Sequence, residues 1–261
     1  EVVAATGCRH YKLKVSGQAD ADIERLRRIA EVLAPVQGLV VTLDGNEQFA
    51  DAEAAAAFWQ RVQTTPQLQA LAERTIYIEQ PLARAIALDA DVRALAAMRP
   101  VLIDESDGTL DAFPRAVQRG YTGVSSKQCK GIYRSLVNAA RCAQRNAQAS
   151  AATCFMSAED LTTQAGLAVQ QDLALVNLIG LGHVERNGHH YVDGFAGQGA
   201  PRGEGQAFLE AQPGLYENQD GAVRLKIKDG RLDLRSLDAP GFGAAAHPDW
   251  NSLEALHGTG G

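Results

Sequence analysis

The sequence lacks the features of a membrane protein and of a disulfide-rich secreted protein. Its apolar runs are far shorter than the roughly 18 residues that a membrane-spanning helix needs. Its four cysteines show no CxxC spacing and no dense framework, which favours reduced thiols. The formal net charge of -6 argues against nucleic acid and membrane surfaces as partners, because both attract basic proteins. We therefore expect a cytoplasmic protein that binds neither.

The sequence also lacks an initiating methionine. It opens on Glu1 rather than Met and enters its first pattern abruptly, so we expect an N-terminal portion to be missing. The 261 residues are enough for one large domain or for two small ones.

What the sequence contains is an alternation of short apolar runs and helical patterns. Residues 39–43 form a continuous β-branched run, as expected of a strand buried on both faces of a parallel sheet. Residues 22–33 place apolar side chains on one face, which predicts an amphipathic helix capped by Asp20 or Asp22. We expect strands at 10–15, 39–43, 75–78, 100–103, 121–126, 153–156 and 183–185, and helices at 22–33, 51–63, 86–98, 110–119, 132–147 and 161–179.

This alternation predicts an α/β fold with right-handed βαβ units and a parallel sheet. A TIM-type barrel is favoured over a doubly wound open sheet, because polar residues end five of the expected strands. A barrel builds its site from many strand ends, whereas an open sheet concentrates it at one switch point. We expect a (β/α)7β barrel domain at 1–194 without its first strand, and a C-terminal extension at 195–261. Asp229-Gly230 predicts a β-hairpin near 223–234 in that extension.

The polar strand ends are the most informative pattern in the sequence. They recur every 23 to 35 residues, with carboxylates inside and lysines outside, as Lys14, Asp44, Glu79, Asp104 and Lys127. Because parallel strand ends converge at one mouth of a barrel, the three carboxylates should meet there and repel one another unless a cation neutralises them. Oxygen ligands of this kind suit Mg2+. The alternative for any single carboxylate is a helix cap or a surface ion pair.

The neighbouring polar residues suggest further roles. Lysines beside a divalent cation lose their proton more readily, so Lys14 and Lys127, on opposite sides of the carboxylates, are candidate acid/base groups. Lys12 is expected to reach the mouth where its strand frays, or else to be solvated or ion-paired. Asn46 is placed to hydrogen-bond a bound carboxylate or a metal ligand. Lys130 is expected at the start of the next helix and ranks below Lys127.

These motifs resemble the barrel domain of the enolase superfamily. Within it, the mandelate racemase/muconate lactonizing enzyme family is the most similar, and in particular the muconate-lactonizing-enzyme subgroup with its dipeptide epimerases and o-succinylbenzoate synthases. The resemblance covers residues 12–131 and rests on Lys12-x-Lys14, Asp44-x-Asn46, Ile78-Glu79-Gln80-Pro81, Asp104-Glu105-Ser106 and Lys127-x-x-Lys130-Gly131.

The resemblance implies a set of roles for these residues. Asp44, Glu79 and Asp104 would ligate Mg2+, and Lys14 and Lys127 would be the acid/base pair on opposite faces of the α-carbon. Lys12 would help to neutralise the enolate. The common step would be removal of the proton α to a carboxylate, with the metal stabilising an enediolate. In this superfamily an N-terminal α+β domain caps the barrel, and nothing in the sequence corresponds to it.

The specific reaction stays open at this point. The last expected strand lacks the Asp-x-Asp with which dipeptide epimerases hold a substrate ammonium group. It offers Glu185 instead, which either contacts a polar or hydroxylated acid or belongs to an exposed loop. We expect a Mg2+-dependent lyase or isomerase (racemase, epimerase, dehydratase or cycloisomerase) that acts on a small carboxylate as a homo-oligomer. The alternatives are a non-catalytic metal-binding barrel homologue and, less favoured, a Schiff-base aldolase.

Overall fold

The computed structural model describes residues 2–150, 153–159, 165–186, 193–243 and 246–252. The chain divides into two compact units. The first consists of Glu1–Ala158 with Leu181–His183, and the second of Glu159–Gly180 with Val184–Gly261. The domain boundary expected at residue 194 stays a prediction.

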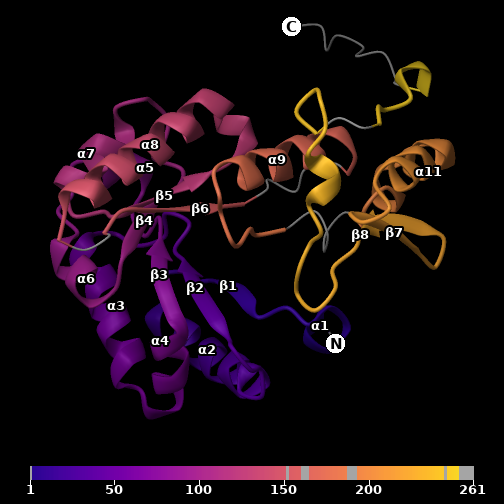
Figure 1. Cartoon of the computed structure of the whole chain (residues 1–261). Helices are drawn as coiled ribbons and strands as arrows, with labels where there is room; N and C mark the ends of the chain where they lie inside the picture. Colours follow the sequence, from indigo (N-terminus) through magenta and orange to yellow (C-terminus); the bar gives the residue numbers. More distant parts are fainter. Residues whose placement is uncertain (1, 151–152, 160–164, 187–192, 244–245, 253–261) are drawn as a thin grey trace, which may run out of the picture. The chain divides into compact units, whose positions relative to one another are not determined.

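The first unit is built on one parallel sheet whose strands pair in chain order (Figure 1). The helices between the strands lie around the sheet (Figure 1). This order is that of a barrel and differs from a doubly wound sheet, in which the strand order reverses at a switch point. The strands are β1 (His10–Lys14), β2 (Val40–Asp44), β3 (Thr75–Glu79), β4 (Val101–Ile103), β5 (Gly123–Ser126) and β6 (Phe155–Ala158). The helices are α1 (Val2–Thr6), α2 (Ala19–Leu33), α3 (Ala52–Thr64), α4 (Gln69–Arg74), α5 (Arg84–Ala87), α6 (Arg93–Met98), α7 (Ala112–Gln118) and α8 (Ile132–Gln148), with short 3₁₀ turns η1 (Pro66–Leu68) and η2 (Gln128–Lys130).

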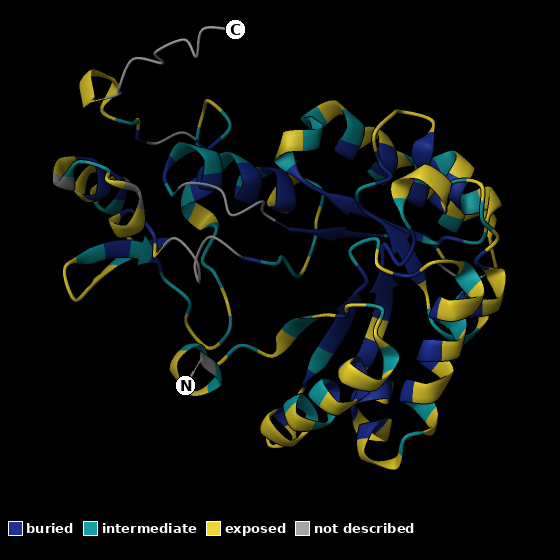
Figure 2. Cartoon of the chain, turned by 180° about the vertical axis from the view of Figure 1, so that it is seen from behind, coloured by how far each residue is buried: buried dark blue, intermediate teal, exposed yellow. Residues whose placement is uncertain are grey.

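The core of this unit lies between the sheet and the apolar faces of its helices, which Figure 2 shows as the buried side of each ribbon. Strand β4 is completely buried, as expected of a central strand of a parallel sheet. Trp59 and Val62 of α3 are fully buried, as their helical spacing predicts. Each such large apolar side chain stabilises the fold by about 1.5–3 kcal/mol through burial.

Two local predictions were wrong. Helix α2 begins after Gln18, with no side-chain cap. Asp22 lies on its buried face instead, where its carboxylate accepts hydrogen bonds from the amide (2.8 Å) and the hydroxyl (3.1 Å) of Ser16. The single helix expected at 86–98 is two short helices, because the Asp91 carboxylate accepts a hydrogen bond from the Arg93 amide (2.9 Å) and starts a new turn there.

The second unit combines helices with an antiparallel hairpin. Its elements are α9 (Leu167–Leu178), α11 (Arg202–Ala211), β7 (Tyr216–Gln219) and β8 (Ala222–Leu225), with 3₁₀ turns η3 (Ala196–Gln198), η4 (Arg235–Leu237) and η5 (Trp250–Ser252). Phe195, Phe208 and Tyr216 form the aromatic centre of its core. The turn between β7 and β8 is Asp220-Gly221, and both residues have positive φ, as a two-residue hairpin requires.

Two expected β-elements of this region are shorter in the structure than the sequence suggests. At Asp229-Gly230 both residues again have positive φ, and one antiparallel bridge, between Lys228 and Arg231, closes the turn. Of the strand expected at 183–185, the described residues keep one parallel bridge, between Glu159 and Glu185.

Candidate active site

The register of the sheet places the polar strand ends side by side. Lys14 pairs with Asp44, and Asp44 pairs with Glu79, so three consecutive strands end at the same level. Both carboxylates are buried, and an oxygen of one lies within 4.8 Å of an oxygen of the other. Two acidic groups this close need a cationic partner.

Two lysines of β1 supply that partner. The side chain of Lys12 is 8% exposed and forms ion pairs with Asp44 Oδ2 (3.0 Å) and Glu79 Oε1 (2.9 Å). Lys14 donates to the same Asp44 oxygen at 2.5 Å, but its side chain is 45% exposed. The expectation that β1 frays at Lys12 was wrong, whereas the alternative of an ion-paired lysine matches its contacts. Residues two apart on a strand share a face, so a regular β1 directs both lysines to the carboxylates.

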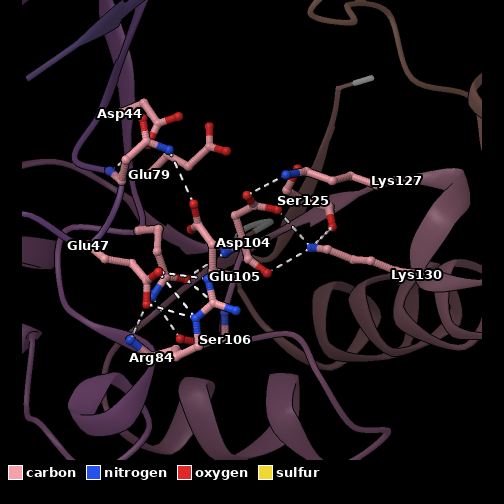
Figure 3. Close-up of polar contacts among 12 residues, drawn as sticks. Asp44, Glu47, Glu79, Arg84, Asp104, Glu105, Ser106, Ser125, Lys127 and Lys130 are labelled. Carbon is pink, nitrogen blue, oxygen red and sulfur yellow. Dashed lines mark hydrogen bonds and ion pairs between the residues drawn. The ribbon is translucent and has the colours of Figure 1, made fainter. Parts of the chain in front are cut away.

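A second group of charges surrounds the carboxylate of Asp104, which follows β4 (Figure 3). Lys127 donates to its Oδ2 at 2.6 Å, and Lys130 donates to its Oδ1 at 2.8 Å. Asp44 and Glu79 each have a carboxylate oxygen within 4.8 Å of the other, and among the described residues Asp104 is not part of that group. The structure thus brings the three predicted ligands to neighbouring strand ends but pairs Asp104 with its own lysines.

Lys130 is closer to the site than the sequence indicated. It lies in η2, a single 3₁₀ turn in which residues three apart are eclipsed, so Lys130 follows Lys127 toward Asp104. Gly131 ends the turn with a φ of 100°, a conformation that favours glycine. The spacing Lys-x-x-Lys-Gly was the signal from which this arrangement could have been found.

Gln80 is a second residue whose role the sequence did not show. Its side chain is fully buried, and its Oε1 accepts hydrogen bonds from the backbone amides of Asp104 (2.8 Å) and Ser106 (3.2 Å). Its Nε2 donates to the Leu82 carbonyl (2.8 Å) and to the Ser106 hydroxyl (2.7 Å). Gln80 therefore fixes the end of β4 to the end of β3 and sets the position of Asp104.

Asn46 lies between the two groups of charges. Its backbone amide donates to Asp44 Oδ1 (2.9 Å), and its side-chain amide donates to Glu105 Oε1 (3.2 Å). Burial, and then the charge of Asp104, raises the pKa of Glu105 above its ordinary value. The backbone amide of Asn46 thus bonds a predicted metal ligand, whereas its side chain bonds Glu105, and a contact of Asn46 with a substrate stays a prediction.

The loops beyond β2 and β3 continue the pairing of their strands. The Gly45 amide donates to the Glu79 carbonyl (2.9 Å), the Glu47 amide to the Gln80 carbonyl (2.9 Å), and the Phe49 amide to Pro81 (3.0 Å). In the same loops, Arg84 forms a two-pronged ion pair with Glu47 (Figure 3). These bonds fix the backbone on either side of Asp44 and Glu79.

Comparison with known proteins identifies the family. The family model described as "Enolase C-terminal domain-like" matches residues 1–250. The chain belongs to this family. No curated protein sequence matches the chain significantly.

Solved structures resemble this enolase-like chain in fold. A muconate lactonizing enzyme from Mucobacterium smegmatis has a TM-score of 0.62 and 17% identity, over 96% of this chain and 59% of that one. A dipeptide epimerase from Methylococcus capsulatus, complexed with Mg ion, has a TM-score of 0.54 and 21% identity, over 86% and 57%. A muconate lactonizing enzyme from Pseudomonas putida has a TM-score of 0.52 and 18% identity, over 70% and 48%. The chain thus spans less than two thirds of each relative's length, and the predicted TIM-type α/β fold is confirmed.

The donors of this enolase-like site fit Mg2+. Asp44, Glu79 and Asp104 are each 1% exposed, and carboxylate oxygens are the ligands that this hard cation prefers. Glu105 Oε2, next to Asp104, is also buried and has no hydrogen-bond partner among the described residues. Such a concentration of buried acidic oxygen is stable only beside positive charge.

Glu185 lies in the second unit, next to a buried ion pair of Arg186 Nη1 with Asp172 Oδ2 (2.5 Å). Its contact with a substrate stays a prediction. The nearby polar residues 187, 189 and 190 fall outside the described residues. In the described part of the chain, no helix combines the length and the apolar character needed to cross a bilayer.

Proposed function

We propose that this chain contains the catalytic centre of a Mg2+-dependent lyase or isomerase that removes the proton α to a carboxylate of a small acid. The observation that supports this most directly is the pairing of buried carboxylates with lysines at the strand ends. Two lysines of β1 face Asp44 and Glu79, and two lysines after β5 face Asp104. Family membership supports the same chemistry, since the structural relatives include racemase-type proteins, epimerases and cycloisomerases.

Each residue has a role in this proposal. Asp44, Glu79 and Asp104 would hold the cation, which, when bound, supplies Lewis-acid stabilisation of the charge that develops on the substrate carboxylate. Lys14 ends β1 and Lys127 follows β5, strands on opposite sides of the three that carry the carboxylates, and both lysines exchange protons with the α-carbon. Lys14 is half exposed and therefore accessible to a substrate, whereas Lys127 is 9% exposed.

The remaining residues orient the substrate. Lys12 places a buried positive charge beside Asp44 and Glu79, where it offsets negative charge on a bound acid. The backbone amide of Asn46 donates to Asp44 Oδ1 and so orients that side chain. Glu185 is proposed to contact a polar substituent of the substrate. Two bases on opposite faces suit racemisation or epimerisation, and one base suffices for elimination or cycloisomerisation.

The test is solvent deuterium exchange at the α-carbon, over a library of small acids, with the full-length protein in Mg2+ and then in EDTA. We expect exchange of at least one acid that EDTA abolishes. Lys14→Ala or Lys127→Ala, or both, should lose exchange while still binding metal: loss in both indicates two bases, and loss in one indicates a single base. Lys228→Ala, an exposed lysine of the second unit, is the control. A filled metal site without exchange of any acid would contradict the proposal and favour a non-catalytic metal-binding homologue.

A further inference from the structure

The ammonium group of Lys130 makes its hydrogen bonds to the protein itself, unlike a group that is free to contact a substrate. Its Nζ donates to three oxygens: Asp104 Oδ1 (2.8 Å), the Asp104 carbonyl (2.8 Å) and the Ser125 carbonyl (3.0 Å). A lysine ammonium has three N–H donors and no acceptor. All three donors of Lys130 are therefore used within the protein, and its side chain is only 12% exposed.

Two of these acceptors are backbone carbonyls at the ends of adjacent strands. The pairing of β4 with β5 ends at Ile103 and Val124, one residue before Asp104 and Ser125. Lys130 Nζ thus connects the ends of β4 and β5 at the point where the pairing of the two strands stops. The same nitrogen also donates to one oxygen of the Asp104 carboxylate. Main chain and side chain of Asp104 are fixed together by one cation.

We propose that Lys130 is a positioning residue for the metal site. Of the two lysines that contact Asp104, Lys130 would orient the carboxylate and Lys127 would transfer protons. Lys130 holds Oδ1, so that Oδ2 is the Asp104 oxygen directed to the cation and to Lys127. This inference rests on the proposed function, because it takes Asp104 to be a metal ligand.

The proposal makes a prediction opposite to that of simple charge repulsion. If Lys130 acted only as a positive charge near the site, its removal would tighten binding of a divalent cation. If it positions Asp104, its removal weakens binding, and loss of an outer partner of a metal ligand typically reduces affinity by about 10- to 100-fold. The direction of the change separates the two.

The experiment is calorimetric titration of Mg2+, and of Mn2+ as a second probe, into the full-length protein without substrate. We expect Lys130→Met to bind each ion about 10- to 100-fold more weakly. Lys130→Arg keeps the charge but cannot donate to three oxygens from a single nitrogen, so we expect a smaller loss. Lys228→Met, the same change at an exposed position, should bind like the wild type.

Each outcome has a defined meaning. Unchanged or tighter binding by Lys130→Met overturns the positioning role, and if that variant does not fold, the same result with Lys130→Arg does so. Absence of binding by the wild type would instead reject the metal site, and with it the proposed function. In an exchange assay, added Mg2+ should restore part of the activity of Lys130→Met and none of that of Lys127→Ala.

Discussion

Replacement of Gln80 by methionine tests whether this buried amide organises the site. Methionine has a similar size and the same backbone requirements at the positive φ of residue 80, so the change removes hydrogen bonds and little else. It leaves three backbone groups without their partner: the amides of Asp104 and Ser106 and the carbonyl of Leu82. A buried group left unpaired costs about 1–3 kcal/mol, so we expect a loss of at least about 3 kcal/mol in the free energy of unfolding.

The assay is urea unfolding followed by circular dichroism and by fluorescence, with the free energy taken from the linear extrapolation. Gln60→Met, the same substitution at an exposed position of α3, is the matched control and should change stability by no more than about 0.5 kcal/mol. A loss below about 1 kcal/mol for Gln80→Met would refute the reasoning, because water or a local shift would then have replaced the lost bonds.

Two further predictions concern the sheet and its pH dependence. A Cβ at Gly123 would lie 2.5 Å from Phe155 Cζ and 2.8 Å from Leu102 Cβ, so Gly123→Ala should lower the free energy of unfolding by about 1–3 kcal/mol. Gly108→Ala, where a Cβ has open space, should leave the free energy of unfolding unchanged. Equal stability of the two variants would contradict this prediction. The rings of His10 and His183 stack at 5.7 Å, and burial lowers the pKa of both. A histidine with a lowered folded pKa contributes full stability above its unfolded pKa of about 6.5 and loses it as the pH falls, so unfolding free energies at about pH 7.5 and 5.5 should differ less in His183→Phe than in the wild type. The same difference in both proteins would exclude the pair as its source.

The strand ends were predictable because two local regularities determine them. Buried β-branched runs mark the strands of a parallel sheet, and parallel pairing brings the residues that follow those runs to one edge. Asp44 and Glu79 are register partners for this reason, and Lys14 is the partner of Asp44.

The missed features depend on contacts between distant segments. Lys130 reaches Asp104 because a 3₁₀ turn, not a helix, follows β5. Gln80 works through backbone groups 24 and 26 residues away, and no periodicity in the sequence shows such bonds. Asp22 reads as a helix cap, yet the loop before the helix folds back to use its carboxylate.

The hydrogen-bonded loops after β2 and β3 restrict which substitutions and insertions this part of the site can accept. The amides of Gly45, Glu47 and Phe49 bond to three consecutive carbonyls from Glu79 onward, so the two loops are held together along their length. The positive φ values of Asn46, Glu47 and Gln80 show that the loops do not continue as regular strands. An added residue in the loop after β2 would break this series of bonds, and a Cβ at Gly45 would lie 2.8 Å from Pro81 Cα. A change of loop length is therefore more easily accepted elsewhere around the mouth of the site.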